Sequence, residues 1–157
     1  MTLETLIARL DALESRAAIE ALISGYANAY DRLDADLLSS LWHADATLEL
    51  PSFGSAGSRD EILAMAERSW QQMPHMHHWM ANPLIHIDAD VATATVAADC
   101  LFHDIEKGPV QVSGLYHDRF ERRDGQWRFA SRYFELHFLT PLPNWQPIAG
   151  SEPFARP

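Results

Sequence analysis

Two long β-strands joined by a tight turn are predicted for residues 109–139, whose sequence is PVQVSGLYHDRFERRDGQWRFASRYFELHFL. Apolar and polar residues alternate on both sides of Asp124-Gly125, a dipeptide typical of hairpin turns. Two further segments rich in β-branched and aromatic residues, 76–88 and 91–105, precede this hairpin and are bounded by turn residues. The sequence therefore indicates an antiparallel meander, with strands at 76–88, 91–105, 109–122 and 126–139.

The first half of the chain has helical spacing instead. Apolar residues recur every three or four positions along 3–13 and again along 16–33, with Ser15 placed to cap a restart between the two. Next are expected a short helix at 34–42, a strand at 46–50 and a loop at 51–57. A further helix is expected at 58–73, where a Ser58–Glu61 capping box begins it and Pro74 ends it. Helices followed by strands indicate an α+β domain, with one curved sheet packed against helices.

The last residues differ in composition from the rest. Residues 143–157 are rich in proline and lack a regular period, so they are expected to form an arm anchored by Trp145 and Phe154. Residues 1–142 are expected to form one domain.

Composition excludes several classes of function. The 157 residues include 12 basic and 22 acidic side chains, a net charge of −10, which disfavours binding to nucleic acid or to anionic lipid. The single cysteine, Cys100, excludes an internal disulfide and a thiolate metal cage. No stretch has the length of a membrane span and the N-terminus does not have the pattern of a secretory signal, so a cytoplasmic protein is expected.

Asp31 is the first candidate for chemistry. It follows the apolar helical stripe that contains Tyr26 and Tyr30, at the edge of the buried face. Its carboxylate either reaches water at the helix end or turns into the fold, and position alone favours the first because aspartate is seldom buried without a partner. The two tyrosines are expected to be core residues whose hydroxyls find a hydrogen-bond partner.

Three histidines, His75, His77 and His78, begin the segment 75–88. Strand alternation places His78, Met80, Asn82, Leu84 and His86 on one face. A His-x-His pair on a strand permits zinc binding, but the sequence has no HExxH motif and no cysteine pair to complete a site, so no metal is predicted. Motifs for nucleotide binding or an acyl-enzyme are absent as well, and no cofactor is predicted.

Two charged residues interrupt apolar strands. Arg132 lies in FASRYFELHF and Asp99 lies in VATATVAADCLF. An unpaired buried charge is very costly, so the two form either a structural ion pair or part of a polar pocket. Gly114, two residues before Tyr116, is expected to favour strong curvature of the sheet.

The order of several segments resembles a known family. These segments are ESRAAIEALISGYANAYDRLD (14–34), LLSSLWHADATLEL (37–50), HHWMANPLIHID (77–88), SGLYHDRFERRDGQWRFASR (113–132) and FLTPL (138–142). They resemble the SnoaL-like branch of the nuclear transport factor 2-like superfamily, and within it the group of hexachlorocyclohexane dehydrochlorinase, scytalone dehydratase and bile-acid dehydratase. The resemblance implies a cone-shaped α+β barrel, in which helices close a strongly curved, mostly antiparallel sheet around a deep pocket.

The resemblance also implies roles for individual residues. Asp31 matches the family's catalytic aspartate, and His78, four residues before Asn82, matches its catalytic histidine. Tyr26 stands where the dehydrochlorinase has a lysine, a departure that suits an oxygen leaving group or a carbonyl. The supporting polar residues are then Tyr26, Asp99 and Arg132, and the expected pocket wall contains Tyr30, Leu48, Met76 and Tyr116.

These expectations combine into one function. His78 and Asp31 would form a dyad in a cofactor-independent, dehydratase-like lyase that removes a proton and expels water or another leaving group. The substrate would be a small, apolar, cyclic or aromatic molecule. The alternatives are an isomerase or retro-aldol enzyme on the same scaffold, and a non-catalytic ligand-binding or assembly module. A homo-oligomer, suspected to be a trimer, is implied by the family.

Overall fold

The computed structural model describes residues 1–146, so most of the arm expected at 143–157, Phe154 included, lies outside the described residues. Helices and strands follow the order α1 (Leu3–Asp31), α2 (Ala35–Ser40), β1 (Trp42–Leu50), β2 (Gly54–Ala56), α3 (Arg59–Gln72), β3 (His75–Asp88), β4 (Val91–Asp104), β5 (Gly108–Arg123) and β6 (Gln126–Pro141). The four strands of the predicted meander are confirmed, with bounds within about two residues of those expected. Among the described residues, no helix combines the length and apolarity that a membrane span requires.

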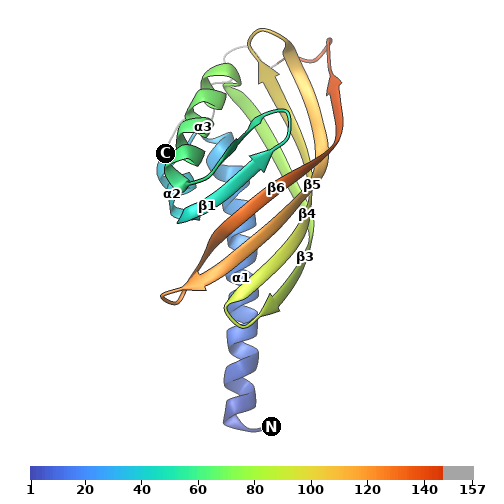
Figure 1. The fold of residues 1–157 in the computed structure, drawn as a ribbon. Coiled ribbons are helices and arrows are strands. Elements are labelled where there is room, and N and C mark those ends of the chain that lie inside the picture. The colour runs from blue at the N-terminus through green and yellow to red at the C-terminus, as the bar shows by residue number, and fades with distance from the viewer. Residues whose placement is uncertain (147–157) are drawn as a thin grey trace.

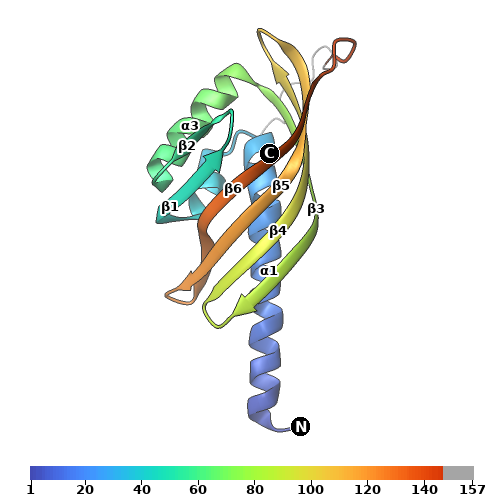
Figure 2. The same cartoon turned by 45° about the vertical axis from the view of Figure 1, so that its right-hand side comes forward.

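The six strands form one curved sheet in the order β2-β1-β6-β5-β4-β3 (Figure 1). All neighbouring pairs are antiparallel except β1 and β6, which run parallel. Helix α1 packs along the hollow side of the sheet, against β3 and β6, and α3 covers β1 and β2 (Figure 2). The expected α+β class, with a curved, mostly antiparallel sheet covered by helices, is confirmed.

Gly114 lies at an irregularity in the pairing of β5 with β6. The pairing of β5 with β6 shifts by one residue between Ser113 and Gly114. A Cβ atom at position 114 would overlap the backbone oxygen of Glu135 and lie 2.9 Å from Cζ of Phe134. Only glycine therefore leaves room at this point of β5 for the backbone of β6 and the ring of Phe134. The expectation that this glycine favours strong curvature of the sheet stays a prediction.

A β-bulge in β3 changes which side chains face the helices. The register of β3 and β4 shifts between Ala81 and Leu84, and Asn82 adopts a φ of 52°. The extra residue moves the following side chains to the opposite faces. Ile85 is therefore buried whereas Leu84 is 77% exposed, so the prediction that Leu84 shares the face of His78 is wrong.

The prediction of a break near Ser15 is wrong, because α1 is one continuous helix of 29 residues. Thr2 caps its start, and Ser15 is buried inside it rather than capping a restart. The N-terminal part of the helix extends beyond the end of the sheet in both views (Figures 1 and 2).

The segment between α2 and α3 is more regular than expected. Strand β1 begins at Trp42 rather than at position 46, and the predicted loop at 51–57 contains the short strand β2. Ser58 caps α3 by accepting a hydrogen bond from the backbone of Glu61 at 3.3 Å. The Glu61 carboxylate accepts instead from the backbone of Gly57 at 2.7 Å, one residue earlier than a standard capping box requires.

Candidate active site

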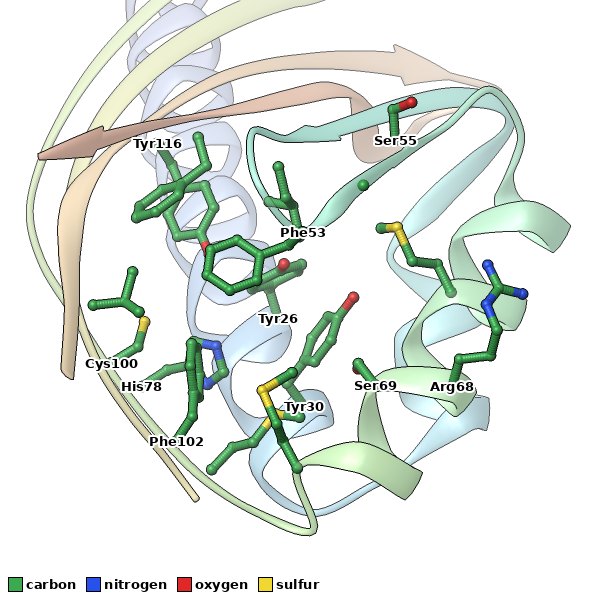
Figure 3. Close-up of a pocket in the computed structure, with 17 residues that line it drawn as sticks. Tyr26, Tyr30, Phe53, Ser55, Arg68, Ser69, His78, Cys100, Phe102 and Tyr116 are labelled. Atoms are coloured by element: carbon green, nitrogen blue, oxygen red, sulfur yellow. The ribbon is translucent and has the colours of Figure 1, made fainter. Parts of the chain in front are cut away.

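A cavity of about 340 Å³ opens between the hollow side of the sheet, α1 and α3 (Figure 3). Most of its wall is apolar or aromatic, which is typical of sites for small organic ligands. The residues that line it are Tyr26, Tyr30, Leu50, Phe53, Gly54, Ser55, Met65, Arg68, Ser69, Met73, Met76, His78, Cys100, Phe102, Val112, Tyr116 and Phe134.

The last residue of α1 meets the start of β3 at this cavity. Oδ1 of Asp31 lies 2.6 Å from Nδ1 of His78, and Oδ2 accepts a hydrogen bond from the His78 backbone N–H at 3.0 Å. Both side chains are mostly buried, with exposed fractions of 13% for Asp31 and 4% for His78. The Asp31 carboxylate is thus turned into the fold, the alternative that its position alone disfavoured.

This contact determines which nitrogen of His78 is free. An ionised carboxylate only accepts hydrogen bonds, so Nδ1 of His78 must carry the proton that it shares with Asp31. In the neutral ring Nε2 then has a lone pair, and it makes no hydrogen bond to another described residue. The rings of Tyr30 and Phe102 flank the imidazole at centroid distances of 5.8 Å and 5.3 Å. The geometry suits a base that accepts a proton from a ligand in the cavity.

Three tyrosines from two elements form the polar part of the wall. The rings of Tyr26 and Tyr30, one turn apart on α1, lie 4.7 Å apart, and Tyr116 on β5 meets Tyr26 edge-on at 5.7 Å. Burial raises the pKa of all three hydroxyls, Tyr116 adds to the rise at Tyr26, and Tyr26 adds to the rise at Tyr30. The three side chains therefore stay protonated and act as hydrogen-bond donors.

Arg132 lies behind these rings and does not line the cavity. Its guanidinium carbon is 4.1 Å from the ring centroids of both Tyr26 and Tyr116. Asp118, its direct neighbour across β5 and β6, accepts two hydrogen bonds from it, each of 2.7 Å. Burial alone would lower the pKa of Arg132, but the charge of Asp118 and these hydrogen bonds outweigh it and raise the pKa. Arg132 is therefore a fully charged, paired cation that packs against the tyrosine wall.

Two further predicted site residues do not line the cavity. Asp99 is exposed on the opposite face of the sheet, because the adjacent Ala98 and Cys100 point inward on β4. It pairs in register with Trp79 and Ser113, so the alternative of an ion pair between Asp99 and Arg132 is wrong, and Asp118 is the partner of Arg132. Leu48 is fully buried in the core and does not line the cavity.

The other residues expected to form the pocket wall do line the cavity. Tyr26, Tyr30, Met76 and Tyr116 all contribute to its wall together with His78. Cys100 also lines it, and burial raises the pKa of its thiol, so the thiolate needed for nucleophilic chemistry is disfavoured. Within residues 1–146, no group of three or more His, Cys, Asp or Glu side chains is placed to hold a metal ion.

The wall supplied by α3 and by the segment before it was not predicted. Arg68 and Ser69 of α3 face the cavity from the side opposite His78 and Cys100, and Phe53 lies between (Figure 3). Among the described residues, Arg68 is the only arginine or lysine that lines the cavity. It forms no ion pair with any of them. The helical period places these side chains on α3 but does not indicate which part of the sheet the helix covers.

Comparisons with known proteins agree with this architecture. The chain is 29% identical over 137 residues to gamma-hexachlorocyclohexane dehydrochlorinase of Sphingobium indicum, covering 85% of this chain and 87% of that protein. The crystal structure of a type 2 hexachlorocyclohexane dehydrochlorinase superposes with a TM-score of 0.85 at 27% identity, over 90% of this chain and 99% of that one. A scytalone dehydratase-like protein of Novosphingobium aromaticivorans, at 21% identity, shares the fold with a TM-score of 0.76 over 90% and 97% of the two chains.

The family assignment rests on a match that spans most of the fold. The profile of the SnoaL-like domain covers residues 11–133, from the middle of α1 to β6, and so includes the Asp31–His78 contact and the tyrosine wall. Together with the curved sheet and its dehydrochlorinase relatives, this match shows that the chain belongs to the SnoaL-like domain family of the nuclear transport factor 2-like superfamily.

Proposed function

We propose that this protein is a cofactor-independent lyase that removes a proton from carbon and expels water or another leaving group from a small, apolar, cyclic substrate. The observation that carries the proposal is the Asp31–His78 hydrogen bond at the wall of an otherwise apolar cavity. The similarity to dehydrochlorinases, which are lyases, supports the reaction class.

His78 is the proposed base. Its Nε2 takes a proton from a substrate carbon while Asp31 holds Nδ1–H and stabilises the imidazolium that forms. The electron pair of the broken C–H bond becomes the new C=C bond, and the bond to the leaving oxygen breaks with its electrons. That oxygen takes up the proton carried by His78 and departs as water, which returns the imidazole to its neutral form.

Tyr26 is the proposed donor to the oxygen of the substrate. Because burial raises the pKa of its hydroxyl, this group stays protonated and can donate to an oxygen that gains negative charge. The lysine of the dehydrochlorinase is replaced by this neutral donor, which favours a hydroxyl or carbonyl oxygen over a halide. Water or a carbonyl-stabilised anion is therefore the more fitting product or intermediate.

The shape and polarity of the cavity indicate the substrate class. A volume of about 340 Å³ with methionine and aromatic walls suits a compact ring compound. His78 and Tyr116 lie at one side, the Arg68 cation lies at the other, and Tyr30 lies between them (Figure 3). A ring with an oxygen function at the tyrosine side and a polar or anionic substituent at the Arg68 side complements both.

The test uses a panel of hydroxylated ring compounds incubated with the protein in D₂O. We expect deuterium to enter the carbon next to the hydroxyl-bearing carbon, and the alkene to form, with the wild type but not with His78→Ala. His86→Ala, on the exposed face of the same strand, is the matched control and should retain turnover. Full turnover by His78→Ala would exclude the proposed base. Compounds that bind without exchange or turnover would instead indicate a binding protein.

A further inference from the structure

The N-terminal third of α1 carries a row of leucines that none of the described residues covers. Leu3, Leu6, Leu10 and Leu13 have exposed fractions of 73%, 45%, 55% and 65%. This part of the helix projects beyond the sheet in both views (Figures 1 and 2). Four exposed leucines in a row are unusual on a monomer surface and indicate a binding face.

The leucine row cannot turn inward, because it lies on the wrong side of the helix. At 100° per residue, its direction differs by about 160° from that of the buried face of α1, which includes Ser15, Ile19 and Tyr26. Rotating the helix to bury the leucines would expel these core residues. The described part of the domain therefore cannot cover the row, and a covering partner must come from elsewhere.

The spacing of the row points to a partner helix. Positions 3, 6, 10 and 13 are separated by three, four and three residues, the a and d positions of two heptads, and the exposed Ala17 is the next a position. In the same frame the next d and a positions are Glu20 and Ser24, both exposed and polar, so the apolar row ends at Ala17. A second helix can thus lie alongside α1 over its projecting part.

The flanking charges fit a second copy of this chain. In this heptad frame Arg9 is at position g and Glu14 is at position e, and neither forms an ion pair with a described residue. In a parallel, in-register coiled coil, position g of one helix lies beside position e five residues later in its partner, which brings Arg9 to Glu14 of the other copy. Antiparallel helices would not form this pair. We propose that α1 is an oligomerisation helix, which joins copies of this chain through a parallel coiled coil centred on Leu6 and Leu10.

Disulfide trapping tests this arrangement directly. Leu3→Cys should form a disulfide-linked dimer under mild oxidation, because a positions meet their own copies in a parallel coil. Ala8→Cys, on the opposite side of the same projecting segment, should not, and the only native thiol, Cys100, is buried. The absence of cross-linking at position 3, or equal cross-linking at positions 3 and 8, would overturn the proposal.

Solution mass supplies a second, independent readout. Sedimentation of the wild type should show an oligomer, and Leu6→Glu with Leu10→Glu should weaken self-association at least tenfold while Ala8→Glu has no effect. Arg9→Glu alone should also weaken it, and Arg9→Glu with Glu14→Arg should restore it. Because all these side chains are exposed, circular dichroism should show the same fold throughout. A monomeric wild type, or an unchanged mass for the double leucine variant, would contradict the proposal.

Discussion

Asp31 holds His78 at two points, the imidazole Nδ1 and the backbone N–H, with the two oxygens of one carboxylate. The strand that carries the histidine and the orientation of its ring are therefore fixed by the same group. A change at Asp31 should act on the protonation of His78 more than on the fold.

Asp31→Asn tests this relationship. The asparagine amide can donate to Nδ1, which would move the ring proton to Nε2 and remove the lone pair that faces the cavity. We expect a folded protein whose turnover falls by about 10³-fold or more. Nitrogen-15 NMR of His78 should report protonation at Nε2 in the variant and at Nδ1 in the wild type. An unchanged tautomer combined with lost activity would contradict the explanation.

Tyr26→Phe removes one hydroxyl from the cavity and leaves the ring that packs on Arg132. Turnover should fall by about 10²- to 10³-fold, because a donor to developing negative charge is lost, while the substrate Kd changes little. Tyr133→Phe, on the exposed face of β6, is the matched control and should match the wild type. A rise in Kd with normal turnover would assign Tyr26 to binding alone.

Arg68→Gln tests the polarity of the cavity mouth. The measurement is calorimetric titration with pairs of ring compounds that carry either a carboxylate or a carboxamide. The variant should bind the carboxylate about two- to fivefold more weakly than the wild type does, which is the effect expected for an exposed ion pair. Binding of the carboxamide should not change. Arg59→Gln, on the same helix but outside the cavity, serves as the control. Equal losses for both ligands would show that Arg68 contributes packing rather than charge.

Loss of one partner of the Arg132–Asp118 pair should strongly destabilise the fold, because both side chains are fully buried. Arg132→Met leaves a buried carboxylate without its partner and should lower the free energy of unfolding by about 3–5 kcal/mol, measured in urea. The double variant Arg132→Met with Asp118→Leu removes both charges and should recover much of this loss. If the double variant were as unstable as the single one, packing on the tyrosines rather than charge pairing would be responsible.

Asp104 should link stability to acid pH. Burial acts to raise the pKa of its carboxyl, but hydrogen bonds from the backbone of Lys107 and Glu106 and from the side chain of Gln72 outweigh burial, and the pKa is lowered. The stabilisation of the fold by the ionised Asp104 is therefore complete when the pH is above the ordinary aspartate pKa of about 3.9. It is lost as the pH falls through the lower pKa that Asp104 has in the folded state.

Asp104→Asn should accordingly lower the free energy of unfolding by about 1–2 kcal/mol at pH 7. The difference from the wild type should shrink as the pH is lowered below about 4. Urea unfolding at a series of pH values measures it, with Asp88→Asn, an exposed residue at the end of β3, as the control. A difference that stays constant down to pH 2 would show that the carboxylate charge is not involved.

The strand pattern was predictable from the sequence because periodicity and turn residues are local signals. The contacts across strands were not, since they depend on single-residue shifts. A regular hairpin around Asp124-Gly125 would pair Asp118 with Ser131, but a shift between Arg119 and Phe120 pairs it with Arg132 instead. The sequence therefore shows a buried arginine in need of a partner without showing which residue supplies it.

The bulge in β3 illustrates the same limit. Alternation correctly places Met76, His78 and Met80 on the inner face, and it fails after Ala81 because Asn82 adopts a left-handed conformation. The Asn-Pro dipeptide at 82–83 is a local signal for such an interruption. The meeting of Asp31 with His78, 47 residues apart, has no local signal and was predicted only through the family resemblance.

Gly114 links the backbone of the sheet to the dimensions of the cavity. Its missing side chain leaves room for the ring of Phe134, which in turn packs at a tilt against Tyr116 with ring centroids 4.8 Å apart, and both rings line the cavity. The volume offered to a ligand is thus set in part by a residue that never touches it. In directed evolution of this scaffold, any side chain at position 114 should displace the backbone of β6, so Gly114 should be kept and the cavity altered through its lining residues.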